Sequence, residues 1–176
     1  MKLAEMLVPE FDQEFDLTRK FLDLVPDDKL TWKPHEKSME LGRLAWHLAT
    51  FPEWTLDTIE KDVFVITPEH ASDSRTGWKG KSRADMLTRF DGDLTRARAA
   101  LTHASDSDFE HHWKLEWNGR VAIDEPRYRI FRRMVLNHLV HHRAQLGVYF
   151  RMIGTAIPGC YGPSADDQAG GTAGSA

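Results

Sequence analysis

Residues 137–146, with the sequence NHLVHHRAQL, decide the fold that we predict for this chain. They lie within a longer stretch, about 126–154, in which apolar residues recur at helical spacing: Phe131, Val135, Leu139, Leu146, Tyr149 and Ile153. A stripe of this kind predicts a long helix with one face in a core. The helix should end near Gly154, because glycine commonly follows the last helical turn and Pro158 comes soon after it.

Three further stretches, at about 2–24, 39–62 and 83–103, carry the same amphipathic pattern. Proline interrupts two of them. Pro9 should start or kink the main helix of the first stretch, and Pro52 should bend the second. Four amphipathic helices joined by short or crossover connections predict an all-α four-helix bundle.

Local signals mark where two of these helices begin. Ser38 is the expected N-cap of the second helix. Ser82 with Asp85 resembles a capping box at the start of the third, with Asp in place of the usual Glu or Gln. Both signals predict a helix start from local hydrogen bonding alone.

A small β-hairpin is expected between the third and fourth helices. Alternating residues at 113–123 flank Asn118-Gly119, which is the strongest short hairpin signal. An isolated hairpin is only marginally stable, so Trp113, Leu115 and Trp117 should pack onto the bundle.

The length of 176 residues suits one domain with a sizeable core, which we place at 1–164. The segment 63–81 is expected to be a long connection and a candidate wall of a pocket. The end of the chain, 165–176, is rich in Gly, Ala and Ser and is expected to be a mobile tail.

Composition excludes several classes of protein. The chain is 41% hydrophobic and 28% charged, as is ordinary for a soluble globular protein, and its net charge of −4 without a basic stripe argues against a nucleic-acid partner. The lone Cys160 rules out an internal disulfide and suits a reducing cytosol. Acidic residues between Met1 and Asp16 argue against a leader, and no apolar run approaches membrane-spanning length. We therefore expect a cytoplasmic protein with no membrane partner.

Three of the nine histidines stand out by position. His138 and His142 are one helical turn apart, and at about 100° per residue His142 falls inside the apolar arc with His138 near its edge. His141 points well away from that arc. His47 lies in the second predicted helix, within the apolar run 44–48. Three neutral imidazoles that converge inside a bundle can hold a divalent metal and leave a coordination position open, as in a catalytic site.

The alternative is that these are ordinary core histidines. A buried imidazole needs partners for both ring nitrogens, and backbone carbonyls or Gln145, on the same face, could supply them as well as a metal. The other histidines lie in predicted loops or near helix ends, where solvated polar residues are expected: His35, His70, His103, His111 and His112. A metal site at His111 and His112 is a minor alternative.

Several segments resemble the signatures of the DinB-like (YfiT-like) metal-binding proteins, and together they span nearly the whole chain: 32–35 (WKPH), 37–39 (KSM), 41–49 (LGRLAWHLA), 137–146 and 157–166 (IPGCYGPSAD). The resemblance implies a four-helix bundle of up-down-down-up topology that is usually a homodimer. It also implies a divalent metal, often nickel or zinc, held by one histidine of the second helix and two of the fourth. Those positions match His47, His138 and His142.

The resemblance also implies an activity, because relatives with assigned roles include thiol-dependent S-transferases and a mycothiol-dependent isomerase. We therefore expect a metal-dependent enzyme that acts on a small electrophile, with a low-molecular-weight thiol as cosubstrate. Metal-dependent hydrolysis and a non-catalytic module that binds metal or a small ligand as a dimer remain as alternatives. No carboxylate stands out as a general base, so no catalytic residue is assigned.

Two further roles are expected near the predicted metal site. Gln145 is the candidate acceptor for a ring N–H of a ligand histidine, and Arg143 should form a structural ion pair. An apolar substrate cavity should be lined by residues such as Trp46, Phe51, Trp54 and Tyr149.

Overall fold

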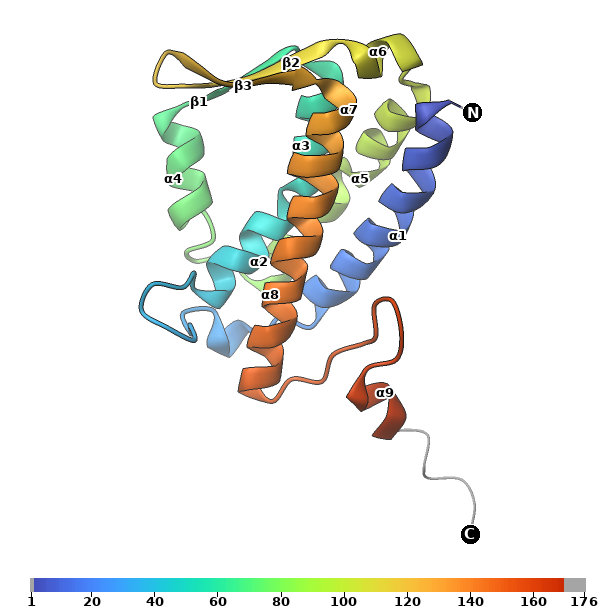
Figure 1. Cartoon of the computed structure of the whole chain (residues 1–176). Helices are drawn as coiled ribbons and strands as arrows, with labels where there is room; N and C mark the ends of the chain where they lie inside the picture. The colour runs from blue at the N-terminus through green and yellow to red at the C-terminus, as the bar shows by residue number, and fades with distance from the viewer. Residues whose placement is uncertain (1, 170–176) are drawn as a thin grey trace.

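The computed structural model describes residues 2–169, and most of these are helical (Figure 1). Residues 170–176 of the predicted tail lie outside the described range. No helix in the described part of the chain is long and apolar enough to cross a membrane. In chain order the elements are α1 (Leu3–Asp23), a 3₁₀ turn (Asp27–Lys29), α2 (Leu41–Ala49), α3 (Phe51–Glu60), β1 (Val63–Ile66), α4 (Pro68–Thr76), α5 (Arg83–His103), α6 (Asp106–Glu110), β2 (His112–Trp117), β3 (Arg120–Pro126), α7 (Arg127–Ile130), a π-helix (Phe131–Asn137), α8 (His138–Ile153) and α9 (Ala165–Ala169).

A three-stranded sheet with the order β1-β2-β3 lies across one end of the long helices (Figure 1). The hairpin of β2 and β3 is antiparallel and turns at Asn118 and Gly119, whose φ angles of 51° and 70° suit the turn that Asn-Gly favours. β1 pairs with β2 in parallel. The prediction of an all-α protein with a two-stranded hairpin is therefore corrected to a mostly helical fold with a three-stranded sheet.

The second predicted helix is two helices, because α2 ends at Ala49 and α3 starts at Phe51. Pro52 lies in the first turn of α3, where its missing N–H costs no helical hydrogen bond. The bend expected at this proline is thus a break. Ser38 is not the N-cap of α2, since Glu40 occupies that position without a side-chain hydrogen bond.

The other helices follow their predicted bounds more closely. α5 covers Arg83–His103, and the reciprocal capping box of Ser82 and Asp85 is present. Pro9 lies inside α1 rather than at its start. The fourth predicted helix contains a π-helical segment, Phe131–Asn137, directly before α8. α8 ends at Ile153, and Gly154 caps it in the left-handed conformation, which confirms the predicted helix end.

The core lies between α1, α2, α3, α5 and α8. Phe11 and Phe15 of α1 stack with their ring centroids 3.9 Å apart, and Phe15 packs against Phe90 of α5 at 5.7 Å. Val135 and Leu139 bring the fourth predicted helix into the same cluster. The predicted apolar stripes are therefore the faces that these helices bury.

Arg143 joins α8 to α1 and to the C-terminal segment. Its guanidinium donates to the Glu14 carboxylate at 2.5 Å, to the Glu14 carbonyl at 2.9 Å and to the Tyr161 hydroxyl at 2.8 Å. The side chains of Arg143 and Glu14 are only 2% and 7% exposed. This is the structural ion pair expected for Arg143. It attaches α8 to α1 at the residue that follows His142.

Candidate metal centre

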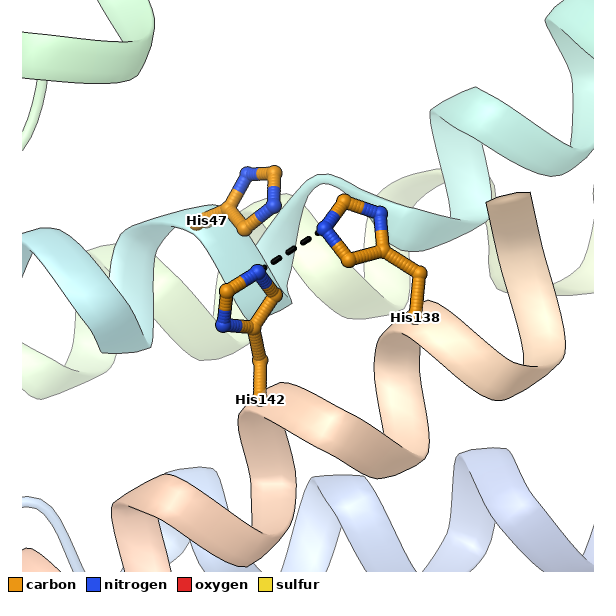
Figure 2. Close-up of side chains that lie close together, drawn as sticks. All are labelled: His47, His138 and His142. Atoms are coloured by element: carbon orange, nitrogen blue, oxygen red, sulfur yellow. Dashed lines mark hydrogen bonds between the residues drawn. The ribbon is translucent and has the colours of Figure 1, made fainter. Parts of the chain in front are cut away.

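His47 of α2 and His138 and His142 of α8 point their rings toward one another (Figure 2). One candidate ligand nitrogen from each lies within 4.8 Å of the others. The Nε2 atoms of His138 and His142 are 2.8 Å apart. Two nitrogens bound to one ion at about 2.1 Å are about 3.0 Å apart at a right angle and about 3.4 Å apart at a tetrahedral angle. His138 and His142 are therefore close to the spacing of two ligands, and a side-chain rotation that brings the His47 nitrogen nearer would let all three share an ion.

Local structure at both helices places these rings. His47 lies in the last turn of α2, and the Thr50 hydroxyl, at the break before α3, donates to the His47 carbonyl at 2.7 Å. His138 is the first residue of α8, directly after the π-helix, so His138 and His142 stand one above the other on regular α-helix. π-helical turns occur frequently at functional sites.

Burial keeps the three imidazoles neutral. Desolvation is the main reason why the pKa of His47 is lowered from 6.5 to about 3. Electrostatic repulsion of a protonated His47 by His142, His138 and Arg43 lowers it further. Desolvation also lowers the pKa of His142 to about 4, although the hydrogen bond to Gln145 opposes it, and lowers the pKa of His138. At neutral pH all three rings therefore offer a lone pair, which is the form that binds a metal.

The proton positions in the cluster favour an ion, rather than a hydrogen bond, between the Nε2 atoms of His138 and His142. Nδ1 of His142 lies 2.8 Å from Oε1 of Gln145, so Nδ1 donates and Nε2 of His142 carries a lone pair. Without an ion, Nε2 of His138 must then hold the proton between the two rings. Its Nδ1 would be bare, and this buried atom has no hydrogen-bond partner of good geometry.

An ion between the rings removes that conflict. Both Nε2 atoms would then be ligands, and the proton of His138 would move to Nδ1. The Met134 carbonyl, one turn earlier, lies on that side and acts to raise the pKa of His138. Nδ1–H would then face an acceptor, the arrangement typical of metal-bound histidines. The residues present therefore fit a divalent metal.

A pocket of about 310 Å³ opens beside His47. It lies between α2, α3, β1 and α4, and Trp46, Trp54, Phe64, His70 and Trp117 are among its lining residues. Within residues 2–169, no fourth His, Cys, Asp or Glu joins the three histidines. His47 is the histidine of the cluster that lines the pocket, so a ligand bound there would lie beside His47.

The expected cavity residues divide between the pocket and the core. Trp46 and Trp54 line the pocket, whereas Phe51 packs against the rings of His47 and His138 at 5.3 Å. Tyr149 instead donates to the Met39 carbonyl at 3.2 Å. Of the hairpin residues, Trp113 is buried as expected, whereas Trp117 is 56% exposed at the pocket rather than packed on the helices.

The segment 63–81 does line the pocket, but as β1 and α4 rather than as a plain connection.

His111 and His112 do not converge on a shared site. His111 lies 3.3 Å from Asp62 and His112 lies 2.6 Å from Asp124. Sequence reasoning missed the pocket arginines, of which Arg43 could have been found by its spacing of four residues from His47.

The fold and the site define a class: a mostly helical protein in which one histidine from one helix and two from another meet beside a pocket. A family model described as the DinB family matches residues 2–173, and the chain belongs to that family.

Named relatives agree with this placement. The chain is 26% identical to the uncharacterized protein YrdA of Bacillus subtilis (strain 168) over 156 residues, covering 89% of this chain and 86% of YrdA. A DinB-like protein from Bacillus cereus ATCC 10987 superposes with a TM-score of 0.67 at 25% identity, covering 91% of this chain and 98% of that one. The DinB-like protein YjoA of B. subtilis shares the fold, with a TM-score of 0.63 at 19% identity over 88% of this chain and 96% of that one.

Proposed function

We propose that the protein is a metal-dependent enzyme, with zinc or nickel held by His47, His138 and His142. The observation that carries the proposal is the convergence of three neutral imidazoles beside a pocket, without a fourth protein donor in the described residues. Catalytic zinc sites commonly have three protein ligands and an open position, whereas structural sites are closed.

The favoured reaction is transfer of a low-molecular-weight thiol to a small electrophile. A sulfur–carbon bond forms, the bond from carbon to the leaving group breaks, and the leaving group departs with that electron pair and ends with the thiol proton. A bound divalent ion supplies Lewis acidity, which lowers the pKa of a thiol or water at the site.

The chain supplies position and surroundings. Gln145 fixes the tautomer and the ring orientation of His142. Trp46, Trp54 and Phe64 give the pocket an apolar wall that suits the apolar part of an electrophile. The same site would also support hydrolysis with water as the nucleophile, and the thiol dependence of turnover separates the two reactions.

The experiment is metal analysis followed by turnover. Purified wild type should contain stoichiometric metal, and His47→Ala and His142→Ala should not. His141→Ala is the matched control, because His141 is exposed and lies outside the cluster of three ligands. Full metal retention in both ligand variants would reject the metal site.

Turnover of 1-chloro-2,4-dinitrobenzene with cysteine and with glutathione should then be lost in His142→Ala and kept in His141→Ala. Equal rates in wild type and His142→Ala would reject metal-dependent thiol transfer. Turnover without thiol would favour hydrolysis, and bound metal without any turnover would favour the non-catalytic module.

We also infer an up-down-down-up four-helix bundle, supported by the packing of α1 on α5 and α8 and of α2 on the same two helices.

We further propose that the protein is a cytoplasmic homodimer. Val148 and Met152 support it, because they lie one turn apart on α8 and are 59% and 58% exposed. Light scattering coupled to size exclusion should give twice the chain mass for wild type and the chain mass for Val148→Glu/Met152→Glu. A monomeric wild type would reject the dimer.

A further inference from the structure

Arg43 is a cation of the pocket that lies close to the candidate metal centre. It precedes His47 by four residues on α2, so both side chains leave the same face of the helix. Both line the pocket, and both are half-buried. The positive charge of Arg43 is close enough to contribute to the lowered pKa of His47.

The guanidinium of Arg43 is held in place but not neutralised. Its Nε donates to the Ser74 carbonyl of α4 at 3.1 Å, which fixes the plane of the group. No carboxylate among residues 2–169 forms an ion pair with it, and its two terminal amino groups make no hydrogen bond within that range. A planar fork of N–H donors therefore remains available on a positioned cation.

The acidic residues of the same pocket are bound elsewhere. Arg89 pairs with Glu53 at 3.0 Å and with Asp73 at 3.2 Å, and it lies over the ring of Trp46 at 4.6 Å. Asp57 pairs with Lys61 at 2.5 Å. Arg43 therefore has no counter-ion among the three carboxylates that line the pocket, because each of them pairs with another cation.

A half-buried guanidinium without a counter-ion is costly to keep, and the paired N–H groups of arginine match a carboxylate in a bidentate geometry. The walls around it are aromatic, from Trp46, Trp54 and Phe64. A second, smaller apolar cavity of about 100 Å³ lies beneath the sheet and shares Trp54 and Phe64 with the pocket as lining residues.

We propose that the pocket binds a small organic carboxylate that carries an aromatic or other apolar group. Arg43 holds the carboxylate, and the apolar group lies against Trp54 and Phe64. The volume of about 310 Å³ is at the lower end of the range for small-molecule sites. That this compound is the substrate or cosubstrate rests on the proposed function, whereas its recognition by Arg43 does not.

The test is isothermal titration calorimetry with 3-phenylpropionate and its uncharged analogue, 3-phenylpropionamide. Both are titrated into wild type, Arg43→Gln and Arg43→Lys, each in zinc-loaded and chelator-treated form. Wild type should prefer the carboxylate in both forms. Arg43→Gln should weaken carboxylate binding about 10-fold or more and leave amide binding unchanged, as expected for loss of a charge-assisted hydrogen bond. Arg43→Lys should retain part of the preference.

Arg75→Gln is the matched control for net charge, because Arg75 also lines the pocket but is exposed. It should change the carboxylate affinity less than 3-fold. Circular dichroism and thermal melting establish that each variant is folded.

The proposal is overturned if neither compound binds wild type, or if wild type binds both equally. It is also overturned if Arg43→Gln binds the carboxylate as tightly as wild type, or if Arg75→Gln weakens it as much as Arg43→Gln does. A carboxylate preference that requires zinc and ignores Arg43 would assign the ion as the anion site instead. Failure of the metal proposal is recognised separately, by wild type that binds no zinc while the chelator-treated protein keeps its preference.

Discussion

Replacing Arg143 with methionine should be among the most destabilising single changes in this protein. The substitution keeps an apolar side chain of similar length in α8 but leaves the Glu14 carboxylate, 7% exposed, buried without its cation. It also removes the hydrogen bonds to the Glu14 carbonyl and to the Tyr161 hydroxyl. Breaking a buried ion pair on one side typically costs about 3–5 kcal/mol.

The assays are urea denaturation and thermal melting of the metal-free protein, both followed by fluorescence. For a domain of this size, 1 kcal/mol corresponds to roughly 2–4 °C, so Arg143→Met should lower the melting temperature by about 6–20 °C. The double variant Glu14→Met/Arg143→Met should be more stable than Arg143→Met alone, because it removes the unpaired carboxylate. A loss below about 1 kcal/mol, or additive effects in the double variant, would refute a strong buried pair.

Three further predictions concern the histidine cluster. Zinc at 100 times its Kd should raise the unfolding free energy of wild type and His141→Ala by about 2.7 kcal/mol, measured by urea denaturation, and no increase is expected in His47→Ala. In the metal-free protein, His47 has a pKa of about 3 when folded and 6.5 as its ordinary value, so the unfolded chain binds the proton first as the pH falls. The contribution of His47 to the free energy of unfolding should be constant above about pH 6.5 and should decline toward pH 3 by at most about 1.4 kcal/mol per pH unit. An equal pH slope in His47→Gln would show that His47 is not the cause of the decline. Gln145→Leu should weaken zinc binding about 10–100-fold, measured by competition with a chelator, and an unchanged affinity would remove Gln145 from this role.

The elements predicted best are those that local interactions determine. The start of α5 follows from the capping box of Ser82 and Asp85, whose hydrogen bonds span only three residues. The Asn118-Gly119 turn is local in the same way, because its two residues adopt the φ angles that the turn requires. Signals of this kind can be read from a few adjacent residues.

Elements that depend on distant partners were missed. β1 has four residues and exists because Val63–Ile66 pairs in parallel with Lys114–Trp117, a contact that neither segment encodes alone. The π-helix before His138 was missed because an apolar stripe looks nearly the same when one turn contains an extra residue. The spacing of four residues between Arg43 and His47 places both on one face of α2, but the pocket beside them depends on the position of α4, which tertiary packing determines.

The inner and outer walls of the site are held by different kinds of interaction. The histidines stand on α2 and α8, whose neighbouring residues are buried in the core, and Arg143 locks α8 to α1 beside His142. α4 buries no residue and is joined to the pocket through polar contacts. Ser74 accepts from Arg43, and Asp73 pairs with Arg89. The proposed ligand would bind the guanidinium that also holds α4, so ligand binding and the position of the outer wall are coupled through Arg43. Changes in α4 should therefore alter which ligand is accepted, while the three histidine rings keep their arrangement.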